Sequence, residues 1–261
     1  MMRRREFLAS TLAAGAGLAT PRALAQSGGY PNRVIRLVVP FPAGGGVDVF
    51  GRLIADKLKE QKGVTVVVEN RAGANGSLGG SVVNQADADG YTLLFSAMTH
   101  VMARYVMRNA PYDPVTDFTP VARVGTAPML LVMSPNLAPK SITELVAQAK
   151  REPDRWIFAI AALGAPGHIA TVAFNNLAGL DLTIATYRGT APGLTDVAGG
   201  HVQLMIDAVL ALLPMARGGK VKALAITAAK RSPLAPDIPT AAEAGMPGRS
   251  EERRVGKECR L

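Results

Sequence analysis

The sequence has few of the residues that build metal sites, disulfides and aromatic surfaces. Among 261 residues there are one cysteine, one tryptophan and three histidines, and aromatic residues make up 5% of the chain. A lone Cys259 cannot form an intramolecular disulfide, and three scattered histidines do not form a zinc-ligand pattern. The sequence therefore predicts no metal ion and no cofactor.

The N-terminal apolar stretch is too short to span a membrane. Residues 8–19 are mostly small and apolar, whereas a membrane-spanning helix needs roughly 20 apolar residues. Three arginines at residues 3–5 precede this stretch, and Ala-Leu-Ala at residues 23–25 is typical of a cleavage site. Residues 4–8, Arg-Arg-Glu-Phe-Leu, also fit the twin-arginine pattern. We therefore expect residues 1–25 to be an export signal that directs the chain to the periplasm.

A concentrated basic surface is also missing. The formal net charge is +9, of which residues 1–25 contribute +3 and residues 249–261 contribute +2, so that +4 remains for residues 26–248. No basic stripe interleaved with aromatic residues runs through the chain. Nucleic acid is therefore not expected as a partner.

What the chain does contain is a glycine-rich motif between two regular patterns. Residues 40–48 read Pro-Phe-Pro-Ala-Gly-Gly-Gly-Val-Asp, after an apolar run at 34–39 typical of a buried strand and before helical spacing at 49–58. Bare N–H groups at the start of a helix suit a carboxylate or phosphate. The motif is neither a dinucleotide fingerprint nor a P-loop. Three glycines also form an ordinary tight turn, and the motif alone leaves both interpretations open.

Strand and helix patterns alternate from residue 30 onward, which predicts an α/β fold. Further strands are expected at residues 64–68, 91–95, 129–133, 156–160, 183–186, 202–206 and 221–226. Further helices are expected at residues 77–88, 141–151, 168–178, 191–198 and 212–217. The helix at 141–151 opens with a capping-box pattern, and the prolines at 111–120 indicate a structured connection.

Two such units predict two lobes with a cleft between them. We expect a first lobe at residues 26–125, a second at 126–236, and a return to the first at 237–248. Loops at the carboxyl ends of the strands would face the cleft, where open α/β sheets bind ligands.

Several separate motifs, in the same order, resemble the Bug-type periplasmic solute receptors of tripartite tricarboxylate transporters. The resemblance runs from about residue 30 to residue 248. Besides residues 40–48, the motifs are Tyr-Pro at 30–31, Glu-Asn-Arg-x-Gly-Ala at 69–74, Asp-Gly-Tyr-Thr-Leu-Leu at 89–94, Pro-Tyr-Asp-Pro-x-x-Asp-Phe at 111–118 and Pro-Thr-x-x-Glu-Ala-Gly at 239–245.

The resemblance implies a two-lobed periplasmic-binding-protein (Venus flytrap) fold and no enzymatic activity. It implies a monomeric receptor that captures a small carboxylate and delivers it to integral-membrane permease subunits. A sensory subunit that presents the carboxylate to a signalling partner shares every one of these features.

The resemblance also implies a first wall of the ligand site. Phe41 is expected to pack on the ligand, and Asp48 to cap the following helix, because it would repel an anion. Backbone amides and close approach are expected from Ala43, Gly44, Gly45 and Gly46. Met98, Thr99 and His100 are expected in a second cleft-facing loop, with His100 bonded either to the ligand or to the backbone.

The facing wall departs from the family pattern. Residues 160–168 read Ile-Ala-Ala-Leu-Gly-Ala-Pro-Gly-His, without the usual serine, asparagine and threonine. A distal carboxylate would then depend on backbone N–H groups, or that end of the ligand is apolar. Arg188 either pairs with a second acid or is a solvated surface residue. The expected ligand-binding residues of this wall are Gly164, Ala165, His168 and Asp207.

The last residues also depart from the family pattern. Residues 249–261 are highly charged and show no helical or strand face. We expect them to be a non-native tail on a truncated chain, which would leave the first lobe incomplete; a native charged tail is the alternative.

A hydrolase is a further alternative. Ser81, His168 and Asp207 can be written as a triad, but no G-x-S-x-G elbow surrounds a serine. The sequence therefore favours a binding protein over an enzyme.

Overall fold

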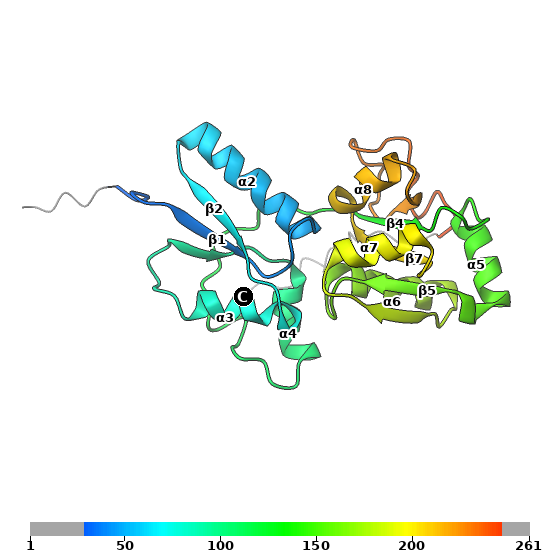
Figure 1. The fold of residues 1–261 in the computed structure, drawn as a ribbon, viewed down its shortest axis with the longest axis horizontal. Coiled ribbons are helices and arrows are strands. Elements are labelled where there is room, and N and C mark those ends of the chain that lie inside the picture. Colours follow the sequence, from blue (N-terminus) through cyan, green and yellow to red (C-terminus); the bar gives the residue numbers. More distant parts are fainter. Residues whose placement is uncertain (1–28, 247–261) are drawn as a thin grey trace, which may run out of the picture. The chain divides into compact units, whose positions relative to one another are not determined.

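The computed structural model describes residues 29–246, and Figure 1 shows the order of their helices and strands. The expected export signal and the expected tail lie outside the described residues. From Arg33 onward the chain belongs to one compact unit. Within the described part, no helix combines the length and the apolar character needed to cross a membrane.

The first sheet has three parallel strands in the order β2-β1-β3. They are β1 (Ile35–Val39), β2 (Val66–Asn70) and β3 (Thr92–Leu94). The helices that follow them are α2 (Gly46–Lys62), α3 (Ser77–Asn84), preceded by the short η1 (Ala74–Gly76), and α4 (Met98–Val106). Because the strands are parallel, their carboxyl ends lie at one edge, where the glycine-rich motif and the start of α4 follow.

The second sheet has five strands in the order β6-β5-β7-β4-β8. They are β4 (Met129–Met133), β5 (Ile157–Ile160), β6 (Thr183–Thr186), β7 (Leu204–Ala208) and β8 (Lys222–Ile226). β5 runs parallel to β6 and β7, whereas β4 is antiparallel to both of its neighbours. The helices of this region are α5 (Ile142–Arg151), α6 (Pro166–Ala178), α7 (Thr190–Gly199) and α8 (Val209–Arg217), with the short η2 (Pro153–Arg155).

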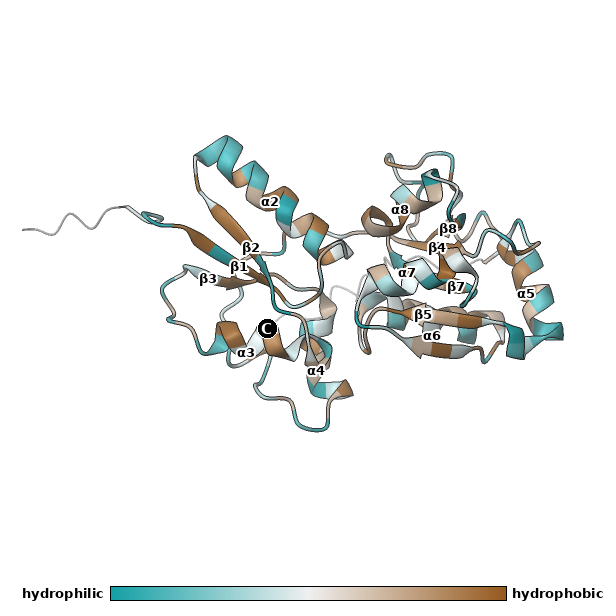
Figure 2. Cartoon of the chain, viewed as in Figure 1, coloured by the Kyte–Doolittle hydropathy of each residue, from teal (hydrophilic) through white to brown (hydrophobic). Residues whose placement is uncertain are grey.

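A hydrophobic core covers each face of the second sheet. Alternate residues of β4 enter opposite cores: Leu131 packs in the cluster with Phe158 and Phe174, and Leu130 in the cluster with Met205. This alternation follows from the two-residue repeat of a strand. The strands accordingly carry the hydrophobic colours in Figure 2, while the exposed end of α5 is hydrophilic.

Most of the predicted elements are present, and the start of α5 is the clearest case. Ser141 precedes the helix, and its Oγ accepts a hydrogen bond from the Glu144 N–H at 3.2 Å. The Glu144 carboxylate accepts one from the Lys140 N–H at 2.9 Å. These bonds satisfy N–H groups that the helix leaves unpaired, as the capping-box pattern predicted.

Two expectations differ from the structure. Met98, Thr99 and His100 do not form a loop; they are the first turn of α4. Residues 237–246 do not return to the first sheet: Thr240 bridges Ile226, and Met246 packs in the core of the second sheet. The apolar residues of this segment are buried against the second sheet. The proline-rich sequence before them did not predict this packing.

Candidate functional site

The three glycines at the start of α2 have three different roles. Gly44 has a φ of 84°, a conformation that glycine adopts without strain. Gly45 is the N-cap residue, with an ordinary φ of −75°. Gly46 begins the helix so close to β7 that a Cβ on it would lie 2.4 Å from the Ala208 Cβ. Only Gly44 therefore needs glycine for its backbone conformation.

Asp48 fixes the shape of this loop. Its carboxylate accepts hydrogen bonds from the Gly44 N–H at 2.9 Å and from Arg52 Nε at 3.1 Å, and it forms an ion pair with a terminal guanidinium nitrogen of Arg52 at 2.9 Å. The residue is 2% exposed. Burial raises the pKa of Asp48, but the hydrogen bonds from Arg52, Gly44 and Asn70 and the Arg52 charge outweigh it, so the pKa lies below the usual value.

Asn70, which sequence reasoning did not single out as a site residue, holds the other side of the loop. Its Nδ2 donates to the Phe41 carbonyl oxygen at 2.9 Å and to Asp48 Oδ1 at 2.9 Å. Its Oδ1 accepts from Arg52 at 2.9 Å. The signal that pointed to it was the motif at 69–74, where it stands at the end of β2.

The first turn of α2 leaves backbone donors unpaired. In residues 29–246, no hydrogen bond engages the N–H of Gly45, Gly46 or Val47. Gly45 is moreover a buried residue, so its N–H has little access to water. Unpaired N–H groups at a helix start, with the positive end of the helix dipole behind them, form a site for an anion.

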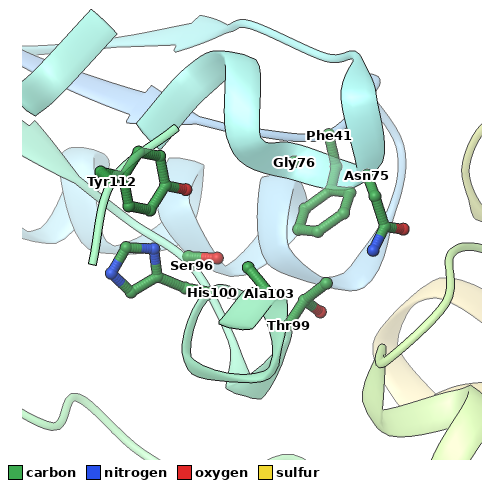
Figure 3. A pocket seen from close by; sticks show the side chains of 8 residues that line it. All are labelled: Phe41, Asn75, Gly76, Ser96, Thr99, His100, Ala103 and Tyr112. Carbon is green, nitrogen blue, oxygen red and sulfur yellow. The ribbon is translucent and has the colours of Figure 1, made fainter. Parts of the chain in front are cut away.

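A pocket lies beside this loop, between Phe41 and α4. Figure 3 shows Phe41 and Asn75 on one side of it and His100 and Tyr112 on the other. Thr99 is 2% exposed, and neither its hydroxyl nor that of Ser96 has a hydrogen-bond partner within the described chain. The remaining lining residues are Gly76 and Ala103.

His100 is bonded to the backbone. Its Nε2 lies 3.2 Å from the Pro114 carbonyl oxygen, which can only accept, so Nε2 carries the proton. The ring stacks on Tyr112 at 5.5 Å and meets Phe118 edge to face at 4.6 Å. Burial lowers the pKa of His100, and the Pro114 carbonyl opposes this only in part. The ring is thus neutral near pH 7 and has an acceptor at Nδ1.

The start of α6 repeats the construction of the glycine-rich loop. Gly164 has a φ of 71°, and its N–H donates to His168 Nδ1 at 3.0 Å. The Ala165 N–H donates to the Ala162 carbonyl oxygen at 3.3 Å. The N–H groups of Gly164 and Ala165 are therefore already used within the loop. Burial lowers the pKa of His168.

Asp207 lies at the carboxyl end of the central strand β7. Its Oδ2 accepts from the Thr190 hydroxyl at 2.7 Å and its Oδ1 from the Ala208 N–H at 2.7 Å. No hydrogen bond in the described residues joins Asp207 to His168 or Ser81, so the structure does not assemble the triad. The Arg188 side chain is exposed.

The glycine-rich loop meets residues of the second sheet. A Cβ on Gly45 would lie 3.5 Å from the Thr190 hydroxyl oxygen, and a Cβ on Gly189 would lie 3.0 Å from Pro42. Asn75 also donates to the Leu163 carbonyl oxygen at 2.7 Å. The structure therefore brings the start of α2 close to the region around Asp207, and η1 close to the loop before α6.

The chain is similar to a family of known receptors. Residues 50–256 match the sequence model described as the tripartite tricarboxylate transporter family receptor, and the match includes part of the expected tail. The chain is 39% identical over 236 residues to Protein BugT of Bordetella pertussis (strain Tohama I). The aligned residues cover 90% of this chain and 72% of BugT.

Two solved structures are similar over most of the chain. R. palustris Rpa4515, solved with adipate, is 40% identical with a TM-score of 0.81, covering 85% of this chain and 74% of that one. MatC (Rpa3494) from Rhodopseudomonas palustris, with bound malate, is 35% identical with a TM-score of 0.75, covering 85% of this chain and 76% of that one.

Proposed function

Because the chain belongs to the tripartite tricarboxylate transporter family of receptors, we propose that it binds a small carboxylate at the start of α2. Membership confirms the two-lobed α/β receptor fold and the periplasmic solute-binding role that the sequence motifs predicted. It also favours a binding protein over a hydrolase. The site residues and the ligand are our proposal.

The proposed site depends on the unpaired backbone donors at the start of α2. The N–H groups of Gly45, Gly46 and Val47 have no partner in the described chain, and Gly45 is buried. A buried N–H without a partner costs free energy, and a carboxylate oxygen removes that cost. Adipate and malate, the ligands of the two similar structures, are both carboxylates.

Asp48 does not compete for these donors. Its oxygens accept from Gly44, Arg52 and Asn70 and hold the loop in shape. A loop that is already fixed loses less conformational entropy when the ligand binds. Asp48 therefore supports ligand binding by holding the loop in shape, and it does not contact the ligand.

The proposal also includes how this receptor reaches the periplasm and which proteins receive its ligand. Residues 1–25 carry the chain across the inner membrane as an export signal with twin-arginine character. Permease subunits of a tripartite tricarboxylate transporter then receive the ligand from the receptor.

A thermal-shift screen of the whole chain against a carboxylate library tests the proposed function. A ligand at about 100 times its Kd stabilises the folded chain by roughly 2.7 kcal/mol, which is measurable as a higher Tm. We expect at least one small carboxylate to raise the Tm. A library in which neutral sugars or cations raise it and no carboxylate does would contradict the proposal.

A further inference from the structure

Residues 73–76, which follow β2, form a turn in which every φ is positive. The values are 141° at Gly73, 45° at Ala74, 55° at Asn75 and 89° at Gly76. Among residues 29–246, Ala74 and Asn75 are the only residues other than glycine with a positive φ. This conformation is strained for most L-residues, and asparagine tolerates it better than alanine. Such strain persists where the surrounding structure fixes it, and it often accompanies a functional role.

Neighbouring residues fix this turn. The Ser77 hydroxyl donates to the Ala74 carbonyl oxygen at 2.8 Å, and Ser77 is 2% exposed. The Gly76 N–H donates to the Gly73 carbonyl oxygen at 2.9 Å. The Asn75 side chain takes no part in these bonds and is available for a partner outside the turn.

That partner lies in the other lobe. We call the first sheet with its helices the first lobe and the second sheet with its helices the second lobe. Asn75 Nδ2 donates to the Leu163 carbonyl oxygen at 2.7 Å, between residues 88 positions apart in the sequence. Every ion pair of the described residues, by contrast, lies within one lobe. The Asn75 bond is therefore a direct polar link between the lobes.

An apolar contact lies beside this bond. Gly164, the residue after Leu163, would place a Cβ 3.1 Å from Met102 Cβ and 3.3 Å from Val106 Cγ1, both on α4. Glycine at this position lets α4 approach the loop closely. The Gly164 N–H also donates to His168 Nδ1 at 3.0 Å, which holds the Leu163 carbonyl group in position for Asn75.

The covalent connection between the lobes does little to fix their arrangement. It runs between α4 and β4, and all residues from 119 to 127 are exposed. No backbone–backbone hydrogen bond in residues 29–246 involves this segment. A segment with few buried contacts and few hydrogen bonds has little local stability. The contacts across the lobes must therefore hold them together.

We propose that Asn75 is an interlobe latch that holds the two lobes together in the ligand-free chain through its bond to the Leu163 carbonyl oxygen. This inference goes beyond the proposed function, because it requires no ligand. Loss of one such hydrogen bond shifts the ratio of closed to open molecules by about two- to tenfold. A ligand enters and leaves the region between the lobes only in the open molecules, so the latch slows both steps.

Thiol labelling of the ligand-free whole chain tests the inference. Thr190→Cys introduces a thiol at a residue that is 7% exposed and faces the first lobe, where its hydroxyl oxygen would lie 3.5 Å from a Cβ on Gly45. Cys259→Ser removes the native thiol. When closing is faster than labelling, the labelling rate is proportional to the fraction of open molecules. We expect Asn75→Gly to raise this rate about two- to tenfold.

Glycine is the suitable replacement, and Ala74→Gly is the matched control. Glycine adopts the φ of 55° at residue 75 without strain, so Asn75→Gly removes the hydrogen bond and leaves the turn possible. Ala74→Gly relieves strain in the same turn and keeps the Asn75 side chain. We expect this control to leave the labelling rate unchanged. An unchanged rate in Asn75→Gly, or an equal rise in Ala74→Gly, would overturn the inference.

A second thiol separates opening of the lobes from unfolding. Ala159 is fully buried in the core of the second sheet, so a thiol introduced by Ala159→Cys is labelled only when that core unfolds. We expect Asn75→Gly to raise the labelling rate at residue 190 by a larger factor than at residue 159. An equal rise at both positions would show that the variant only destabilises the chain, and the latch would be rejected. Because no ligand is present, a failed carboxylate screen leaves this result unaffected.

Discussion

The Gly44 N–H donates to the Asp48 carboxylate at 2.9 Å, across the junction between β1 and α2. The same relationship recurs in the second sheet, where Gly164 donates to His168 at 3.0 Å. In both cases a glycine with positive φ bonds to the side chain four residues later, within the first turn of the helix. Each loop is therefore held in part by the helix that follows it, in addition to the bonds from Asn70 and Asn75.

Replacing Gly45 with valine is expected to abolish carboxylate binding while the fold remains. Gly45 has an ordinary φ of −75°, so valine meets no backbone strain there. Its branched side chain would fill the space beside the Thr190 hydroxyl, 3.5 Å from the Cβ position, and cover the unpaired N–H groups. Titration of a folded Gly45→Val variant with hexanoate checks this, and retained affinity would mean that the loop is only a turn.

Gly44→Ala is the control for that experiment. Nothing lies within 4 Å of a Cβ on Gly44, so alanine blocks no ligand. It must adopt a φ of 84°, which costs an L-residue about 1–2 kcal/mol. We expect a lower Tm but measurable binding, the opposite pattern to Gly45→Val.

Acid is expected to destabilise the chain partly through Asp48. Its pKa is lowered in the folded state, so it contributes stability above the unfolded-state pKa of about 3.9. That contribution is lost as the pH falls through the folded-state value. Denaturant titrations from pH 7 to about pH 2 should show a smaller loss of unfolding free energy for Asp48→Asn than for the native chain. Parallel curves would show that the pKa of Asp48 does not differ between the folded and unfolded states.

Thr99→Val is expected to raise the Tm of the ligand-free chain. The Thr99 hydroxyl is buried without a partner in the described residues, and such a group costs about 1–3 kcal/mol. Valine has nearly the same shape and no hydroxyl. A lower Tm would show that the hydroxyl is satisfied in solution, and weaker hexanoate binding would show that it contacts the ligand.

The distal end of the ligand is expected to be apolar. The N–H groups of Gly164 and Ala165 are already bonded within the loop, and the side chains at residues 160–165 offer no donors. A second buried carboxylate would lack donors from these side chains and from the Gly164 and Ala165 N–H groups, so hexanoate should bind at least about tenfold more tightly than adipate. Tighter binding of adipate that is lost in Arg188→Ala would show that this exposed arginine pairs with the second acid.

Local patterns in the sequence predicted the elements but not their long-range partners. The capping box at Ser141, the strand of residues 129–133 and the glycine-rich helix start all depend on neighbours within a few residues. The packing of Met246 on the second sheet and the bond from Asn70 to the Phe41 carbonyl join distant segments. The periodic patterns of helices and strands carry no information about such contacts, so the sequence alone did not predict them.

The same distinction applies to the site. Residues 43–46 were predicted from the glycine-rich pattern together with the family resemblance, and the unpaired helix start on which that prediction depends is a local feature. The neutral surroundings of Asp207 depend on residues from α7 and β7 and on the glycine-rich loop. The sequence already predicted Asp207 as a ligand-binding residue, but its hydrogen-bond partners became visible only once these elements were placed together.

The central claim is that the start of α2 binds a carboxylate by its charge. Calorimetric titration of the native chain with one acid, its primary amide and its methyl ester tests this most directly. A charge-assisted hydrogen bond contributes roughly 1.5–3 kcal/mol, so we expect hexanoate to bind about ten to a hundred times more tightly than either neutral derivative. Equal affinities for the acid, the amide and the ester would contradict the claim.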